Sequence, residues 1–235
     1  MHFLPTGDRT GPADEHEIST ALARLLVSRH GFLSRSPLAD PMLRAALLAD
    51  WMVSGRLSET ATELSIDTSP TPNPAANALL ERIAAEPGYL LADWLADDQG
   101  TFALFIGHLV ASGLLLRCRS VLVPRYRDRF GLEPRRRLTA RLSGVIYERR
   151  HETPAVIALA ALADLLGLLR PGFVDLTTTN PAGGSESRHA LGDVSAVDRA
   201  GPLRDLLDET QDWAIAQLLR IRAQSTVNIV PFNPM

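Results

Sequence analysis

The sequence predicts an all-α protein, a helical bundle with one or two β-hairpins. Hydrophobic residues make up 46% of the 235 residues and charged residues 22%, which is typical of a globular, helix-rich protein. Most apolar residues recur at intervals of three and four, as on the buried face of a helix. Two short stretches instead have the character of β-strands. The length is ample for a hydrophobic core.

The first 55 residues are expected to hold two helices. Helical spacing begins with Ile18 and Leu22 and stops by Gly31. A second helix is predicted over 37–53, with apolar residues at fourfold spacing. Gly55 follows it as a C-terminal stop, because glycine readily adopts the left-handed conformation that ends many helices.

A β-hairpin is predicted next. Residues 56–60 and 63–67 alternate in period two and are joined by a short polar turn. Prolines close the hairpin, and the third helix is expected to start there with Asn73 as N-cap and Pro74 at its first position.

The middle of the chain predicts several helices and a second hairpin. Residues 114–123 form a second short β-rich connection, and an arginine-rich helix is expected over about 135–150. The apolar positions that predict the helices are Leu79, Leu80 and Ile83, then Leu90, Leu91, Trp94 and Leu95, then residues 101–112, then Leu138, Leu142, Val145 and Ile146.

Two further helices are predicted in the last third. Thr153 and Pro154 start a helix that is apolar nearly all round, which places it at the centre of the bundle. Residues 177–201 are rich in Gly, Ser, Thr and Asn and predict a loop. Pro202 opens the last long helix, whose apolar stripe is predicted to be Leu203, Leu206, Leu207, Trp213 and Leu218.

These elements are expected to form a single domain. We predict a polar tail over 1–13, one helical domain over 14–223 that includes the loop 177–201, and a C-terminal tail over 224–235. No internal repeat divides the chain.

Catalytic and metal-binding patterns are missing from the sequence. It has no Gly-rich phosphate loop, no Gly-x-Ser-x-Gly and no His-Glu-x-x-His. Its one cysteine, Cys118, excludes an internal disulfide and a cysteine-based zinc site, and fits a reducing, cytoplasmic setting. The longest apolar run, 155–169, contains Asp164 and is shorter than the roughly 20 residues that cross a bilayer. We therefore expect no enzyme, no cofactor and no membrane span.

The charge is unevenly distributed along the chain. All 24 basic residues are arginines. Residues 117–150 hold eleven of them against three acidic residues, a net charge of +8, while the remainder carries −11. Such asymmetry suggests an anionic partner. The alternative is a solvated basic face that the acidic remainder of the same fold neutralises, and the charge alone leaves both open.

Three consecutive arginines, Arg135 to Arg137, follow Pro134 and are predicted in the first turn of their helix. The macrodipole is positive there, so cations at this end cost stability and favour an anion-binding role. Two anions compete, an anionic membrane surface and DNA. Residues 108–127 resemble a helix followed by a basic hairpin, as in a winged-helix module, but the helix lacks base-reading side chains.

Several segments follow one another in a specific order and spacing. They are "LRAALLADWMVSGRL" (43–57), a hairpin, "SPTPNPAANALLERI" (69–83), "LADWL" (91–95), "HLVASGLL" (108–115) and the arginine-rich stretch that follows. This series resembles the Golgi phosphoprotein 3 family, in its bacterial, actinobacterial-like form, over about 37–170. The resemblance implies a helical bundle with a projecting hairpin, and a peripheral membrane protein that binds phosphoinositide headgroups. In eukaryotic members it also implies an adaptor that retains membrane glycosyltransferases.

The resemblance carries over only in part at the family's headgroup site. Its headgroup arginine falls on Arg44, but its tryptophan falls on Arg35. Its arginine pair falls on Gln99 and Phe102.

We therefore predict a cytoplasmic, non-enzymatic, peripheral membrane protein that binds anionic phospholipid headgroups of phosphoinositide type. An adaptor role toward a membrane-protein client, and self-association, are left open. The alternatives are a winged-helix-like DNA-binding regulator and a protein–protein scaffold that uses the acidic hairpin at 58–66. The predicted anion-binding residues are Arg44, Arg125, Arg127, Arg129, Arg135, Arg136, Arg137 and Arg141.

Overall fold

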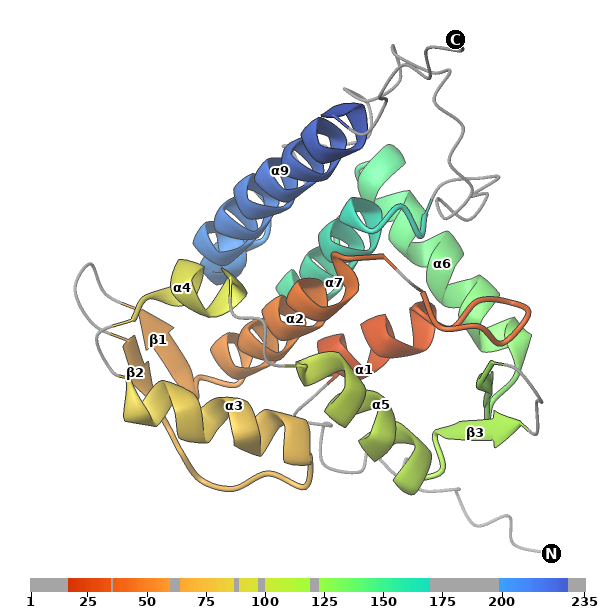
Figure 1. The fold of residues 1–235 in the computed structure, drawn as a ribbon, viewed down its shortest axis with the longest axis horizontal. Helices are drawn as coiled ribbons and strands as arrows, with labels where there is room; N and C mark the ends of the chain where they lie inside the picture. The colour runs from red at the N-terminus through yellow and green to blue at the C-terminus, as the bar shows by residue number, and fades with distance from the viewer. Residues whose placement is uncertain are drawn as a thin grey trace, which may run out of the picture.

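The protein is described here by a computed structural model that covers residues 17–34, 36–59, 64–86, 89–96, 100–118, 123–169 and 199–227. These residues form helices and two separate antiparallel hairpins, which confirms the predicted fold class (Figure 1). The predicted tail 1–13 and most of the predicted loop 177–201 lie outside the described residues. The elements are α1 (Glu17–Leu25), α2 (Ala39–Val53), β1 (Leu57–Glu59), β2 (Leu64–Ile66), α3 (Pro74–Ala85), α4 (Leu91–Ala96), α5 (Thr101–Ala111), β3 (Leu115–Cys118), β4 (Arg125–Asp128), α6 (Leu132–Tyr147), α7 (Pro154–Leu165), η2 (Gly201–Leu203) and α9 (Arg204–Val227).

Helices α2 and α7 form the centre of the bundle. In α7 every residue from Ile157 to Asp164 is buried, as its all-round apolar pattern predicts. In helix α2 every residue from Pro41 to Trp51 is buried, and the helix packs against α1, α5, α7 and α9. In Figure 1, α9, α2, α7 and α6 lie side by side, and the core is buried where α2 packs against α9 and α7 and where α7 packs against α6.

The local signals around the first hairpin are confirmed. Strand β1 pairs with β2, and Leu57 lies opposite Ile66. At the start of α3, the Asn73 side chain accepts hydrogen bonds from the backbone N–H groups of Ala75 (2.9 Å) and Ala76 (3.4 Å). Pro74 occupies the first helical position, where its missing N–H costs nothing.

Helix α1 is held at both ends by charged side chains from distant parts of the chain. Asp50 of α2 accepts hydrogen bonds from the backbone N–H groups of Ile18 (2.8 Å) and Ser19 (3.0 Å). At the other end, the Arg135 guanidinium donates to carbonyl oxygens in and just after the last turn. An acid at the N-terminus and a cation at the C-terminus both complement the helix dipole. They stabilise a nine-residue helix that would be marginal by itself.

Two predicted helix starts need correction. Helix α6 begins at Leu132, three residues before the predicted start, so Pro134 is its third residue and Arg136 and Arg137 lie beyond its first turn. Proline is tolerated in a first turn, where N–H groups have no partner within the helix. The last long helix starts at Arg204, after the short 3₁₀ turn of η2.

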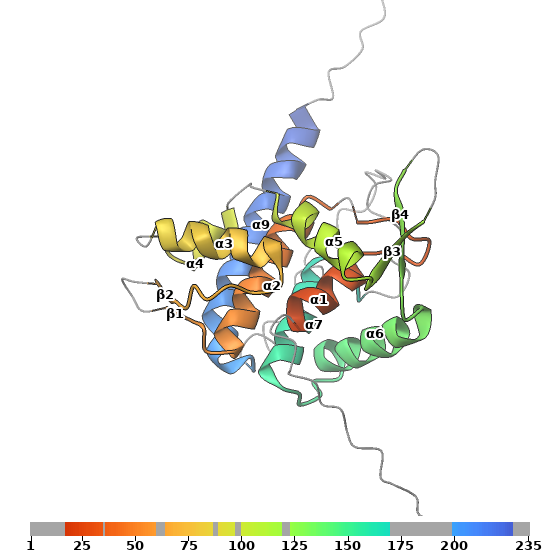
Figure 2. The ribbon, with the colours of Figure 1, turned by 90° about the horizontal axis from the view of Figure 1, so that it is seen from below.

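The predicted apolar stripe of α9 is correct only for its first half. Leu203, Leu206 and Leu207 are buried, whereas the Leu218 side chain is 40% exposed. Figure 2 shows why, since the end of α9 extends beyond the other helices. Within the described residues, no helix is both long enough and apolar enough to cross a membrane.

The two hairpins lie at opposite ends of the molecule. Figures 1 and 2 both place β1 and β2 at one end, next to α3, and β3 and β4 at the other, next to α6. The second hairpin uses residues 115–118 and 125–128, so its return strand is the arginine-rich segment after the predicted β-rich stretch. The described arginines of this hairpin and of the first half of α6 therefore lie at one end of the bundle.

Candidate anion-binding surface

Three segments meet at the end of the molecule opposite the first hairpin. These are the turn 28–31 after α1, the hairpin β3–β4, and the first half of α6. The Tyr126 N–H donates to the Gly31 carbonyl oxygen at 2.7 Å, which joins the turn to β4. The Arg24 guanidinium forms two hydrogen bonds with Asp128, at 2.7 and 3.1 Å. We call this region the basic end.

The close approach of the turn to β4 depends on glycine. Gly31 has φ +83°, a conformation that side chains other than glycine's rarely adopt. A Cβ atom at this position would also lie 2.6 Å from the Tyr126 carbonyl oxygen. The turn that carries Arg29 and His30 thus lies directly against the backbone of the hairpin.

Five of the predicted anion-binding arginines are exposed at the basic end. Arg125 and Arg127 alternate along β4 with the less exposed Tyr126 and Asp128. The Arg125 guanidinium lies over the Phe32 ring, 4.8 Å from its centre. Within the described residues, the only ion pair that these five form is a long one of 4.0 Å between Arg137 and Glu133, on an exposed helix surface where such pairs contribute little. The five are Arg125, Arg127, Arg129, Arg136 and Arg137.

Two other predicted arginines are engaged by the protein itself. The Arg135 guanidinium donates to the carbonyl oxygens of Arg24 (3.0 Å), Leu25 (2.8 Å) and Val27, so it caps α1. Burial lowers its pKa, and the nearby Asp128 partly opposes that effect. Arg141 forms a bidentate ion pair with Glu152, with hydrogen bonds of 2.9 and 2.6 Å. These hydrogen bonds hold the pKa of Glu152 below its ordinary value.

Arg29 and two exposed apolar residues were missed by the sequence reasoning. The Phe130 side chain is 55% exposed and that of Leu132 50%, and both lie between the arginines of β4 and those of α6. The Arg24 guanidinium lies 5.1 Å from the centre of the Phe130 ring and so holds it at the surface. The signal in the sequence was "RFGLEP", an apolar pair that interrupts a charged run without helical spacing.

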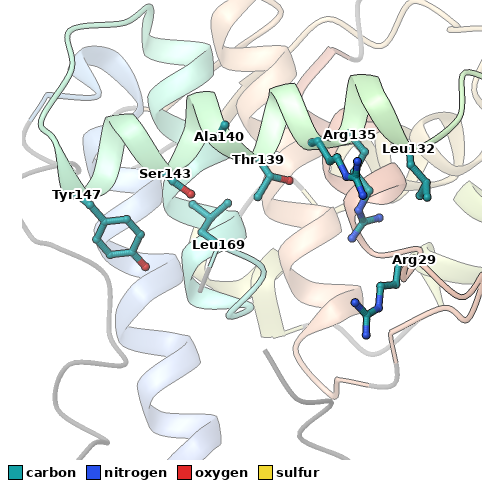
Figure 3. A pocket seen from close by; sticks show the side chains of 9 residues that line it. Arg29, Leu132, Arg135, Thr139, Ala140, Ser143, Tyr147 and Leu169 are labelled. Carbon is teal, nitrogen blue, oxygen red and sulfur yellow. The ribbon is translucent and has the colours of Figure 1, made fainter. Parts of the chain in front are cut away.

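A groove runs from the basic end along α6 (Figure 3). Its volume is about 620 Å³. Side chains from α6 form one wall, and Arg29 and Leu169 face them from the opposite side. A second, smaller hollow of about 390 Å³ lies against β4 and shares Arg29, Leu132 and Arg135 with the groove.

The comparison with protein families decides the assignment. A family model described as Golgi phosphoprotein 3 (GPP34) matches residues 16–216, most of the chain. The chain belongs to the Golgi phosphoprotein 3 family. Among individual curated proteins, none matches it.

Membership confirms the resemblance seen in the sequence. Proteins of this family are associated, at the level of the family, with an adaptor role in which they bind lipids and other proteins. The Golgi phosphoprotein 3 family is not known for an enzymatic activity.

The position that the resemblance assigned to the headgroup arginine is buried in this member of the family. Arg44 is 0% exposed, pairs with Asp40 and donates to the Trp94 carbonyl oxygen at 3.0 Å. Asp40 also accepts a hydrogen bond from the Phe102 N–H at the start of α5. The Arg44 guanidinium is therefore buried and paired with a carboxylate of the protein, so it is not available to a headgroup phosphate at the surface. The two other positions compared, Arg35 and Gln99, lie outside the described residues.

Proposed function

We propose that this chain is a peripheral membrane protein that lies on anionic bilayers with its basic end and binds phospholipid headgroups there. The observation that carries the proposal is the exposure of Phe130 and Leu132 among exposed arginines. Each arginine near anionic headgroups contributes roughly 1 kcal/mol. Apolar side chains between them add to the binding by entering the boundary between headgroups and acyl chains.

Guanidinium groups suit this role because their planar fork binds phosphate oxygens through two parallel hydrogen bonds. Arg127 and Arg129 on the hairpin, and Arg136 and Arg137 on α6, flank the two apolar residues from both sides. This arrangement supports headgroup contact at the basic end. We leave Arg44 and Arg135 out of the proposed surface, because their guanidinium groups are held by Asp40 and by the last turn of α1. Phosphoinositide headgroups, a membrane-protein client and a cytoplasmic location remain parts of this proposal that the family association supports only in general terms.

Sedimentation with vesicles tests the proposal. Vesicles of phosphatidylcholine with 0, 10 and 30 mol% of an anionic phospholipid are mixed with the full chain at 0.05 and 0.3 M salt. We expect no binding without the anionic lipid, binding that rises with its content, and weaker binding at high salt, because exposed charges are screened. Absence of binding to the most anionic vesicles at low salt would contradict the proposal.

Binding to DNA is the control arm of the same experiment. The exposed positions of α5, which precedes the basic hairpin, are Ala103, Leu104, Gly107 and Ala111, none of which reads a base edge. We therefore expect only salt-sensitive, sequence-independent retardation of duplex DNA. A sequence-dependent shift that persists at 0.3 M salt would favour the regulator over the membrane protein.

A further inference from the structure

The groove along α6 has a regular wall. Leu132, Arg136, Ala140, Ser143 and Tyr147 follow one another at intervals of three or four residues, so they lie on one stripe of the helix. Figure 3 shows the side chains of Leu132, Ser143 and Tyr147 directed to the same side of α6, with Arg29 opposite one end and Leu169 opposite the middle. The stripe covers 15 steps along the helix, which is roughly 22 Å.

The two ends of this groove differ in chemistry. Arg29 and Arg135 lie at the end next to Leu132 (Figure 3), and Arg136 follows Leu132 by about one helical turn. The remainder of the groove is lined by Thr139, Ala140, Ser143, Tyr147 and Leu169. None of the described residues that line the groove is acidic. Arg135 is committed to α1, and the Arg29 Nε–H donates to His30 Nε2 at 3.0 Å. The terminal nitrogens of Arg29 and the guanidinium of Arg136 are therefore the groups of this lining that can meet an anion. The groove is therefore cationic at one end and largely apolar along its length.

We infer that this groove binds one single-chain phospholipid of lysophosphatidate type, drawn from the membrane. The phosphate lies between Arg29 and Arg136, and the acyl chain lies along the α6 stripe. This inference rests on the proposed attraction of the basic end to anionic lipid, and adds the binding of an individual lipid molecule.

Size and position support this ligand. An acyl chain fills half of a hydrocarbon core of about 30 Å, hence roughly 15 Å, and the stripe leaves room beyond it for a headgroup. The volume of about 620 Å³ lies within the range of about 300–1,000 Å³ that is usual for small-molecule sites. The single stripe along α6 provides an apolar surface for one acyl chain. The cationic end adjoins Leu132, which we propose to enter the bilayer, so a lipid can pass from the membrane into the groove.

Calorimetric titration of the full chain tests the inference. The probe is decanoyl lysophosphatidate below the concentration at which it forms micelles. The comparison probes are monodecanoylglycerol, which has the chain without the phosphate, and inorganic phosphate, which lacks the chain. We expect a stoichiometry of one for the lysophosphatidate and binding at least about tenfold weaker for either comparison probe, because each lacks one half of the contacts.

Two variants and two matched controls locate the site. Ala140→Trp fills the apolar part, and Arg136→Gln removes one phosphate contact; both positions are exposed, so folding should be preserved. Each substitution should weaken the binding of lysophosphatidate by about tenfold. Ala111→Trp on α5 and Arg220→Gln on α9 make the same changes at exposed positions that do not line the groove and lie outside the proposed membrane-binding surface. They should leave the affinity unchanged.

The outcomes separate this inference from the proposed function. Vesicle binding without lysophosphatidate binding overturns the inference and leaves the proposed function standing. Lysophosphatidate binding that Ala140→Trp weakens supports the inference even if vesicles do not bind. Equal affinity for inorganic phosphate would mean a simple anion site and overturns it. Sedimentation equilibrium that shows a dimer, lost in Ala140→Trp, without lysophosphatidate binding would mean that a second copy covers the groove, and overturns it as well.

Discussion

Arg135 and Arg136 are adjacent in α6, yet their guanidinium groups have different surroundings. Arg135 turns toward α1, where three carbonyl oxygens accept its hydrogen bonds and burial lowers its pKa. Arg136 remains exposed at the mouth of the groove. Because a helix turns by about 100° per residue, consecutive residues face different partners. The same residue type thus stabilises the fold at one position and is available to a ligand at the next.

Replacement of these two arginines should therefore have different consequences. We expect Arg135→Gln to lower the free energy of unfolding by about 2–3 kcal/mol, because hydrogen bonds of a charged group contribute about 1.5–3 kcal/mol and the last turn of α1 loses its cap. Arg136→Gln, at an exposed position, should change the free energy by less than about 0.5 kcal/mol. Urea unfolding followed by circular dichroism measures both. Equal midpoints for the two variants would refute the capping role.

At the scale of elements, the basic end depends on how the turn 28–31 joins β4. Gly31 provides the conformation and the space for that junction. We expect Gly31→Ala to destabilise the protein by about 2–4 kcal/mol, since strain in a left-handed conformation of about 1–2 kcal/mol adds to a clash with the Tyr126 carbonyl. Gly55→Ala is the matched control, because Gly55 has a similar φ of +73° but nothing within 4 Å of its added Cβ. Thermal unfolding of both variants isolates the cost of the close approach; equal losses would contradict it.

The segment that joins β4 to α6, from Phe130 to the first helical residue Leu132, is the second element on which binding should depend. Replacing Phe130 and Leu132 together by serine should weaken binding to anionic vesicles by at least about tenfold. Full burial of such a side chain contributes about 1.5–3 kcal/mol, and these are about half exposed. The free energy of unfolding should change little, because both side chains are already about half exposed in the folded protein.

A matched double variant controls for the loss of exposed apolar surface. Leu104 on α5 and Val53 at the end of α2 are 47% and 49% exposed and lie outside the basic end. Their replacement by serine should leave vesicle binding unchanged. If the two double variants weakened binding equally, apolar contact at the β4–α6 turn would not be the cause.

At the scale of the whole molecule, charge is separated between two ends. The second hairpin brings exposed arginines, whereas the sequence of the first hairpin, residues 58–67, contains three acidic residues and no arginine. Only one end of the molecule is therefore suited to an anionic surface, and the protein should bind in a single orientation.

Cys118 offers a direct measurement of that orientation. It is the one cysteine of the chain, it is exposed, and it lies on β3 at the basic end. A polarity-sensitive dye attached to Cys118 should shift to shorter wavelength when anionic vesicles are added. The same dye on Ser65→Cys in a Cys118→Ser background, at the opposite hairpin, should not. A shift at the first hairpin and none at Cys118 would place the other end of the molecule on the membrane.

Much of the fold could be predicted because its signals are local. The cap Asn73–Pro74, the alternation around Leu57 and the all-round apolar pattern after Pro154 depend on neighbours in the sequence, and the structure confirms them. The exposed end of α9 could not be predicted, because the pattern that includes Leu218 does not reveal where the bundle stops. The start of α6 was predicted three residues too late. A proline inside the first turn of a helix has the same sequence signature as a proline just before the helix.

The sequence by itself determined the helical class, the order of the elements and the concentration of positive charge between 117 and 150, because propensity, periodicity and net charge are properties of neighbouring residues. Only the tertiary structure decided which arginines are available. The guanidinium of Arg44 is paired with Asp40 inside the bundle, that of Arg135 holds a helix more than a hundred residues earlier in the chain, and Arg29 joins the surface from α1's end. A charged side chain takes whatever partner the packing brings within hydrogen-bonding distance, and that partner lies far away in the sequence.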